Sequence, residues 1–219
     1  MTRAYLIRHG QTVWNAEGRA QGQMESEFNP LGRAQAARLA RVLSALPFRA
    51  VYSSPLLRAL DTAQAVAAPH GLSVVTDRDL REIGLGAWEG LTTAQINEGF
   101  GDMIARRRRD PLGVVPPGGE SLPQLQTRVM GALQAILGGH DDAMIAIIAH
   151  GAVNRIVLLT VLGAPLTSYW KLRQDNGAIN IVEFNAGRSS VRAVNETAHL
   201  ADVDVEPSRS ARPGGPATS

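Results

Sequence analysis

The sequence predicts an α/β protein with three layers, α/β/α, built around a mostly parallel central sheet. Short apolar segments alternate along the chain with longer segments of helical spacing, which is the pattern of parallel strands covered by helices. The apolar run AMIAIIA at residues 143–149 is typical of a central strand buried on both faces. A chain of 219 residues, of which 44% are hydrophobic, is long enough to bury the core of one such domain.

The first half of the chain is expected to supply three short strands, at residues 4–8, 50–54 and 72–76. Two helices separate them, over residues 29–46 and 54–71. Each helix begins with a polar capping residue and then a proline, which fits the first helical position because its missing N–H would have no partner there. The pairs Asn29-Pro30 and Ser54-Pro55 therefore predict two helices that begin in the same way.

The second half begins with an irregular segment, because glycines at 84, 86 and 90 precede a helix that is capped by Thr92 or Thr93. Prolines and glycines exclude residues 110–119, DPLGVVPPGG, from helices and central strands. The elements expected next are a helix over 121–137, the strand at 143–149, a helix within HGAVNRIVLLTVLG, and strands at 178–184 and 190–194. The last two strands pair through the turn NAGRS, and the first of them is a candidate edge for a homodimer.

Composition excludes several classes of protein. The chain has no cysteine, so it has no disulfide framework, thiolate nucleophile or cysteine metal site. Its formal net charge of +2 does not predict a nucleic-acid partner, and its longest apolar runs are too short to span a membrane. The N-terminal segment MTRAYLIRHG lacks the apolar region of a secretion signal. We therefore expect a soluble, cytoplasmic protein that binds neither nucleic acid nor membrane.

Two predicted strands end in the same way, with a histidine followed by a glycine, at His9-Gly10 and His150-Gly151. Ligands of open α/β sheets bind at the carboxyl edge of the strands, where these histidines are expected. His150 also precedes a helix, so amide groups near Gly151 can point at an anion with the helix dipole behind them. Either histidine alone would be interpreted as a packed, hydrogen-bonded strand-end residue, but the pair predicts an anion site.

Four short motifs occur in an order and spacing that resembles the histidine phosphatase superfamily, also called the phosphoglycerate-mutase-like family. They are RHG followed by QTVWN, then SSPLLRALDT with Arg58, LREIGLGAWEG with Glu82, and the late AHG with His150. The resemblance covers residues 4–200. It implies a single catalytic domain over residues 1–202 with a substrate-covering segment at about 92–122, while residues 203–219 are expected to form a disordered tail.

The resemblance implies that His9 is a nucleophile, which attacks phosphorus to form a phosphohistidine that water later hydrolyses. Arg8, Arg58 and His150 would form the cradle for the phosphoryl oxygens, with His150 protonated while phosphate is bound. Because these arginines supply the charge that a divalent ion would otherwise bring, we expect neither a metal nor another cofactor.

Further residues take roles from the same resemblance. Asn15 would donate a hydrogen bond to phosphate, Gln21 and Gly22 would lie in a loop that contacts substrate, and the amide of Gly151 would complete the phosphate site. Glu82 would act first as the general acid for the leaving oxygen and then as the general base for water. Without the family context, Glu82 would be interpreted as a surface side chain paired with Arg81.

Four consecutive arginines, Arg106, Arg107, Arg108 and Arg109, stand out in the sequence ARRRRD. On a helix successive residues are rotated by about 100°, so at most one or two of these side chains can face a pocket. Two interpretations stay open: a solvated helix face, or one arginine that binds a carboxylate or second anionic group of the substrate.

The segment between Glu82 and His150 is of modest length, and PPGGESL at residues 116–122 resembles the phosphatase branch, including its broad-specificity members. The resemblance therefore implies a phosphomonoesterase that hydrolyses small phosphorylated metabolites. One alternative is a cofactor-dependent phosphoglycerate mutase, and another is a non-catalytic scaffold that binds phosphorylated ligands.

Overall fold

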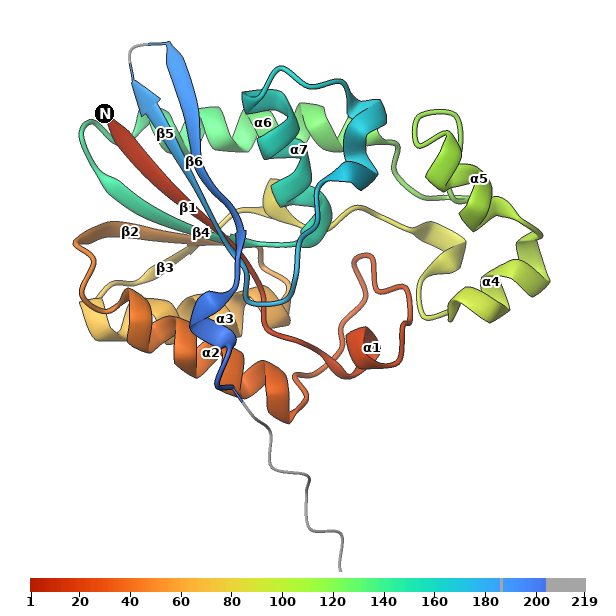
Figure 1. Cartoon of the computed structure of the whole chain (residues 1–219), viewed down its shortest axis with the longest axis horizontal. Coiled ribbons are helices and arrows are strands. Elements are labelled where there is room, and N and C mark those ends of the chain that lie inside the picture. Colours follow the sequence, from red (N-terminus) through yellow and green to blue (C-terminus); the bar gives the residue numbers. More distant parts are fainter. Residues whose placement is uncertain (186, 204–219) are drawn as a thin grey trace, which may run out of the picture.

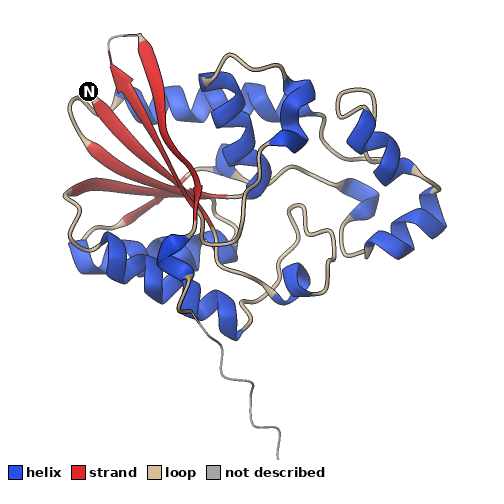
Figure 2. Ribbon diagram, viewed as in Figure 1, coloured by secondary structure: helices blue, strands red, loops and turns tan. Residues whose placement is uncertain are grey.

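The computed structural model describes residues 1–185 and 187–203, so nearly all of the tail expected at 203–219 lies outside the described residues. Its six strands form one sheet in the order β3-β2-β4-β1-β5-β6. The strands are β1 (Thr2–Arg8), β2 (Phe48–Ser53), β3 (Val74–Thr76), β4 (Met144–Ala149), β5 (Ile179–Asn185) and β6 (Arg188–Glu196). Figure 2 shows the sheet as a twisted layer with helices on both sides.

Strand direction places the ends of three strands together. β4 pairs in parallel with β1 on one side and with β2 on the other, and β2 pairs in parallel with β3. Arg8 lies opposite Ala149, and Ser53 lies opposite Ile148, so β1, β2 and β4 end at the same edge of the sheet. The residues that directly follow these strands therefore meet there, as predicted for an open α/β sheet.

The two closing strands form the expected hairpin, but the candidate dimer edge is wrong. β5 pairs antiparallel with β1 on one side and with β6 on the other. The segment predicted as an edge at 178–184 is therefore an inner strand, and β6 is the outer strand on that side of the sheet. β5 has no free backbone edge to offer a second copy of the chain.

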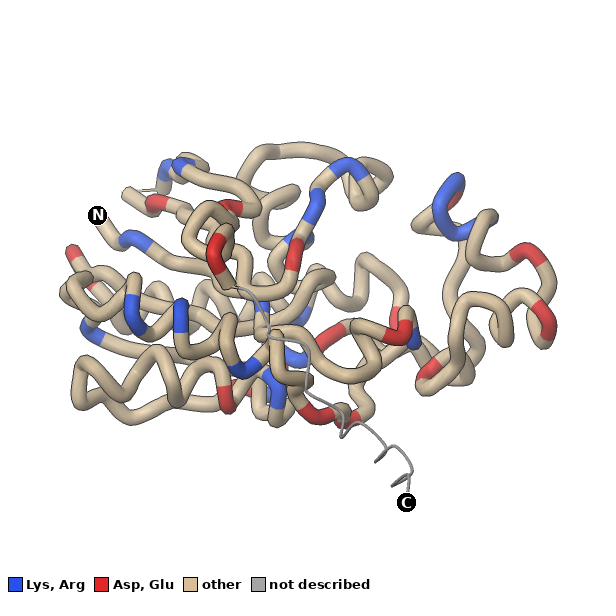
Figure 3. Tube along the Cα trace, turned by 60° about the horizontal axis from the view of Figure 1, so that its bottom comes forward, with Lys and Arg blue, Asp and Glu red and all other residues tan. Residues whose placement is uncertain are grey.

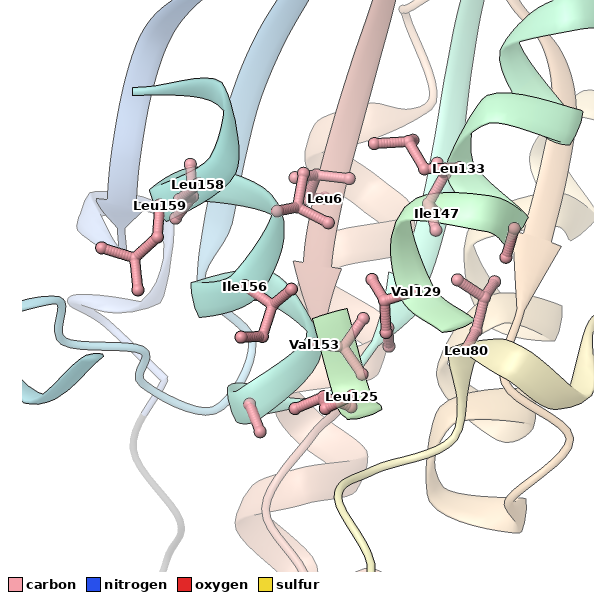
Figure 4. Close-up of a cluster of buried hydrophobic side chains, with 14 of the residues drawn as sticks. Leu6, Leu80, Leu125, Val129, Leu133, Ile147, Val153, Ile156, Leu158 and Leu159 are labelled. Atoms are coloured by element: carbon pink, nitrogen blue, oxygen red, sulfur yellow. The ribbon is translucent and has the colours of Figure 1, made fainter. Parts of the chain in front are cut away.

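Helices cover both faces of the sheet, which gives the predicted three layers (Figure 1). Helices α6 (Leu122–Gly138) and α7 (Gly151–Val161) lie on one face, and α2 (Pro30–Leu43) and α3 (Leu57–Ala67) lie on the other. Side chains alternate between the faces along each strand, so Leu6 joins the first core and Ile7 the second. Figure 4 shows the first core, where α6 and α7 pack apolar side chains against Leu6 and Ile147.

Only one of the two predicted cap-and-proline starts is formed. Asn29 caps α2, and its side-chain oxygen accepts a hydrogen bond from the amide of Gly32 at 2.8 Å. α3 instead begins after Leu56, without a side-chain cap. The hydroxyl of Ser54 accepts from the amide of Leu56 at 3.3 Å and also bonds to His150, so Ser54 belongs to the turn before the helix.

Two helices lie beyond the carboxyl edge of the sheet, at the right of Figure 1. These are α4 (Thr93–Phe100), capped by Thr92 as predicted, and α5 (Met103–Arg109). Residues 110–119 form turns and loops, also as predicted. The remaining elements are short: α1 (Val13–Ala16) and 3₁₀ turns at Ala68–His70, Arg78–Leu80, Gly86–Trp88, Leu166–Lys171 and Ala198–Leu200. In the part of the chain that the structure describes, no helix is both long and apolar enough to cross a membrane.

Candidate active site

A cavity of about 250 Å³ opens at the carboxyl edge of the sheet. The predicted site residues that line it are Arg8, His9, Asn15, Gln21, Gly22, Arg58, Glu82 and Gly151. His150 lies directly against His9, with the two ring centroids 5.1 Å apart. The structure therefore brings together every side chain that the sequence assigned to this site, although the residues come from widely separated parts of the chain.

The tautomer of His9 follows from its hydrogen bond. Its Nδ1 lies 2.7 Å from the carbonyl oxygen of Gly10. A carbonyl oxygen can only accept, so Nδ1 carries the proton and Nε2 of the neutral ring keeps its lone pair. An Nε2 lone pair is what attack on phosphorus requires.

Both histidines of the site are held in the neutral form. Burial lowers the pKa of His9 well below its usual value, and the positive charges of Arg58 and Arg8 lower it further. Burial likewise lowers the pKa of His150, again with contributions from Arg58 and Arg8. His9 is thus available as a nucleophile at neutral pH without any loss of a proton.

Arg8 and Arg58 are fixed by backbone carbonyl groups and keep other N–H groups unpaired. Arg8 donates from Nη1 to the carbonyl of Gln174 at 2.7 Å. Arg58 donates to the carbonyls of Met24 and Gly22 at 2.8 and 2.7 Å. The buried Nε atoms of both arginines have no hydrogen-bond partner within the described chain. Burial lowers the pKa of Arg8 to about 10, which leaves the guanidinium charged at neutral pH. Such oriented cationic donors suit an oxyanion.

His150 is completely buried and is held by Ser54. Its Nε2 lies 2.8 Å from the Ser54 hydroxyl, while its Nδ1 has no hydrogen-bond partner among the described residues. Ser54 thus orients the second histidine. The predicted cap at Ser54 is not formed because the backbone of Leu56 is extended, with φ −65° and ψ 131°, so the helix begins only after it.

The loop after β1 completes one wall of the cavity. The side-chain oxygen of Asn15 accepts hydrogen bonds from the Thr12 amide and the Asn176 side chain, at 3.1 Å each. These bonds leave the Asn15 NH₂ group as the donor on that side chain. Gln21 donates to the Thr12 hydroxyl, and Gly22 supplies the carbonyl that holds Arg58. Gly22 has a φ of +53°, a conformation that favours glycine.

Glu82 points at the start of α7. Its carboxylate accepts hydrogen bonds from the amides of Ile83 at 2.9 Å and Ala152 at 3.2 Å. The amide of Ala152 at the helix start therefore binds this carboxylate and does not face a bound anion as predicted. Arg81 donates to the Arg78 carbonyl, and no ion pair joins it to Glu82 within residues 1–185 and 187–203.

The description of the matching family model is "Histidine phosphatase superfamily (branch 1)", and it matches residues 4–197. The chain belongs to this superfamily. It is 30% identical over 206 residues to Phosphoserine phosphatase 1 of Hydrogenobacter thermophilus, a match that covers 94% of this chain and 98% of the relative.

The chain is also similar in structure to solved proteins over nearly its whole length. The chain is similar to YhfR of Bacillus stearothermophilus, with a TM-score of 0.86 and 33% identity over 91% of this chain and all of the other. It is also similar to a mycobacterial glucosyl-3-phosphoglycerate phosphatase solved with VO3, with a TM-score of 0.83 and 31% identity over 89% of this chain and 99% of the other. The family and these matches over nearly the whole chain show that this histidine phosphatase is a hydrolytic enzyme. The matches favour a phosphatase over the mutase alternative.

Among the four consecutive arginines of this histidine phosphatase, only Arg107 lines the cavity. Its residue is 6% exposed, whereas Arg106, Arg108 and Arg109 are exposed on α5. Figure 3 shows these basic residues as the blue turn at the end of the molecule that carries α4 and α5. A solvated helix face therefore describes Arg106, Arg108 and Arg109, whereas Arg107 faces the cavity.

Sequence reasoning missed several residues of the cavity wall, among them Arg155, Tyr169 and Trp170. The guanidinium of Arg155 lies over the rings of Tyr169 and Trp170, 5.1 and 5.7 Å from their centroids. Arg155 could have been found, because it follows Gly151 by four residues and so lies one helical turn along the same face of α7. In the described residues, no group of three or more His, Asp or Glu side chains is placed to hold a metal ion.

Proposed function

We propose that the chain hydrolyses small phosphomonoesters through a phosphohistidine formed on His9. The observation that carries this proposal is the arrangement around His9: an Nε2 lone pair in one cavity with two buried guanidinium groups and one carboxylate. This combination supplies a nucleophile, an oxyanion cradle and a proton donor or acceptor within one site.

In the first step Nε2 of His9 attacks phosphorus, and the bond from phosphorus to the ester oxygen breaks. Arg8, Arg58 and His150 bind the three non-bridging oxygens, whose charge grows as the phosphoryl group is transferred. A phosphate dianion beside His150 opposes the arginine charges that lower its pKa, so His150 takes up a proton when substrate binds. Glu82, in its protonated form, gives its proton to the leaving alkoxide.

In the second step water attacks the phosphohistidine. Glu82, now a carboxylate, takes the proton of that water, and the bond from phosphorus to Nε2 breaks. Inorganic phosphate leaves, and His9 returns to the neutral ring with its proton on Nδ1. The same carboxyl group thus serves both steps, and the sum of the two is the hydrolysis of one ester bond.

Arg107 supports a substrate class, namely phosphomonoesters that carry a carboxylate near the phosphate. It is a buried cation in the cavity wall, and no ion pair within the described residues engages its side chain. Two relatives are named for phosphoserine and for glucosyl-3-phosphoglycerate, and both compounds combine a phosphate with a carboxylate. The segment at about 92–122, which contains α4 and α5, would cover such a substrate and bring Arg107 to it.

We also propose that the enzyme is cytoplasmic, acts on a small molecule and has no nucleic-acid or membrane partner. The small net charge of +2 supports the absence of a nucleic-acid partner. The test is release of phosphate from a panel of phosphomonoesters that includes phosphoserine, 3-phosphoglycerate and propyl phosphate. The 3-phosphoglycerate reaction is run with and without a bisphosphoglycerate primer. We expect hydrolysis without interconversion of phosphoglycerates; primed interconversion that outruns hydrolysis would replace this proposal with the mutase alternative.

A further inference from the structure

Arg128, on α6, uses every N–H group of its guanidinium. It donates from Nε and Nη2 to the two carboxylate oxygens of Glu120, at 2.7 and 2.8 Å. It donates from Nη1 to the carbonyls of Asp79 and Arg81, at 2.6 and 2.7 Å, and from Nη2 to the carbonyl of Glu82 at 3.0 Å. Three carbonyls of the segment that carries Glu82 therefore converge on one side chain.

Glu120 binds the same segment at Gly84, two residues after Glu82. Its Oε2 accepts a hydrogen bond from the amide of Gly84 at 3.2 Å, and its own amide donates to the Gly84 carbonyl at 2.8 Å. The side chains of Arg128 and Glu120 are only 16% and 17% exposed, so water screens this pair weakly. Glu120 directly follows the loop at residues 110–119, which connects α5 to α6.

The segment needs such support because it has little regular structure. After the 3₁₀ turn at Arg78–Leu80 the backbone forms no helix or strand until Gly86. Besides the two amides that bind its carboxylate, the described hydrogen bonds to Glu82 come from Arg128 and Gln23, which donate to its carbonyl at 3.0 and 3.1 Å. A proton donor must lie within hydrogen-bond reach of the leaving oxygen, and a displacement of about 1 Å can cost on the order of 100-fold in rate.

We propose that Arg128, together with Glu120, is a positioning residue for proton transfer by Glu82. This inference rests on the proposed function, because it gives Arg128 an effect only through the acid and base role of Glu82. Arg128 is not among the residues that line the cavity, so any effect on the reaction must pass through other residues.

The experiment measures the rate of phosphoenzyme formation by rapid quench with two substrates. Propyl phosphate has a basic leaving group that needs a proton, whereas para-nitrophenyl phosphate has a leaving group that departs unaided. For Arg128→Lys we expect a loss of about 10-fold or more with propyl phosphate and of less than about 3-fold with para-nitrophenyl phosphate. Glu120→Gln is a second variant that keeps the shape of the partner, and we expect the same selectivity from it if Arg128→Lys folds poorly.

A double-variant cycle tests whether the effect passes through Glu82. In the Glu82→Gln background, Arg128→Lys should cause no further selective loss with propyl phosphate. Arg3→Met is the matched control, since Arg3 forms another partly buried pair, with Glu183 at 2.7 Å on strands β1 and β5. It should lower thermal stability without changing the ratio of the two rates.

The outcomes separate this inference from the proposed function. Equal losses with both substrates in Arg128→Lys and Glu120→Gln, combined with a selective loss in Glu82→Gln, would overturn the positioning role and leave the proposed function intact. Absence of a selective loss in Glu82→Gln itself would overturn the acid role on which both rest. Additive effects in the double variant would show that Arg128 acts by another route, which also overturns the inference.

Discussion

The ring of His9 packs edge-on against the ring of His150, with centroids 5.1 Å apart and planes inclined by 61°. Both residues are buried, and both follow parallel strands that end at the same edge of the sheet. Two uncharged imidazoles at this distance are compatible with the guanidinium groups of Arg8 and Arg58 beside them, whereas two imidazolium ions would be strongly disfavoured.

This arrangement predicts a pH dependence of stability. Burial lowers the folded-state pKa of both histidines well below the unfolded value of about 6.5, so the unfolded chain binds more protons in the acid range. The free energy of unfolding should therefore fall as the pH drops below about 6.5. Urea unfolding at pH 7 and pH 5, without phosphate, measures this change. In a His9→Gln/His150→Gln variant the decrease should be smaller; a decrease as large as in the wild type would show that other groups cause it.

Glu82→Gln should separate the leaving groups. Phosphoenzyme formation from propyl phosphate should slow by about 100-fold or more, because its alkoxide needs a proton, while para-nitrophenyl phosphate should lose much less. The comparison needs the first turnover, since Glu82 is also proposed to activate water in the second step. Equal losses would remove Glu82 from the acid role. Glu120 would be a poor replacement, because both of its oxygens are bound by Arg128.

Arg107→Met should raise the KM for 3-phosphoglycerate by about 10- to 100-fold, which corresponds to the loss of a hydrogen bond to a charged group. Propyl phosphate, which has no carboxylate, should be hydrolysed at nearly the wild-type efficiency. Methionine keeps most of the packing at this buried position on α5. Arg109→Met is the control on the same helix, because the side chain of Arg109 is 73% exposed. An equal effect on both substrates would assign Arg107 to packing or to the phosphate itself.

Activity should survive treatment with EDTA followed by gel filtration. Arg8, Arg58 and a protonated His150 are proposed to neutralise the charge that develops on the phosphoryl oxygens, so the reaction needs no divalent ion. Phosphate release before and after treatment is the measurement. A loss that an added divalent ion restores would mean that a metal takes part.

Local sequence patterns predicted the sheet and the two histidines of the site, while the family resemblance implied the other site residues. His9 and His150 each follow an apolar strand, and Asn29 caps its helix through an amide three residues away. The parallel pairing of β1, β2 and β4 then follows from the alternation of strands and helices.

Other features depend on contacts between distant segments, for which a single sequence carries no signal. Ser54 bonds to His150, 96 positions away, and its predicted helix begins only after the extended Leu56. Arg128 reaches Glu82 across 46 positions and looks in the sequence like an ordinary arginine on a helix. The inner position of β5 was also missed, because pairing on both of its sides depends on the order of strands in the sheet.

The phosphohistidine on His9 is tested most directly by trapping it. The enzyme is mixed with ³²P-labelled substrate, quenched in alkali within the first turnover, and digested for mass spectrometry. The label should be found on His9, should be lost in acid and kept in base, and should be absent from a correctly folded His9→Ala variant that retains no more than a few per cent of wild-type activity. Label on another residue, or full activity in His9→Ala, would contradict the account.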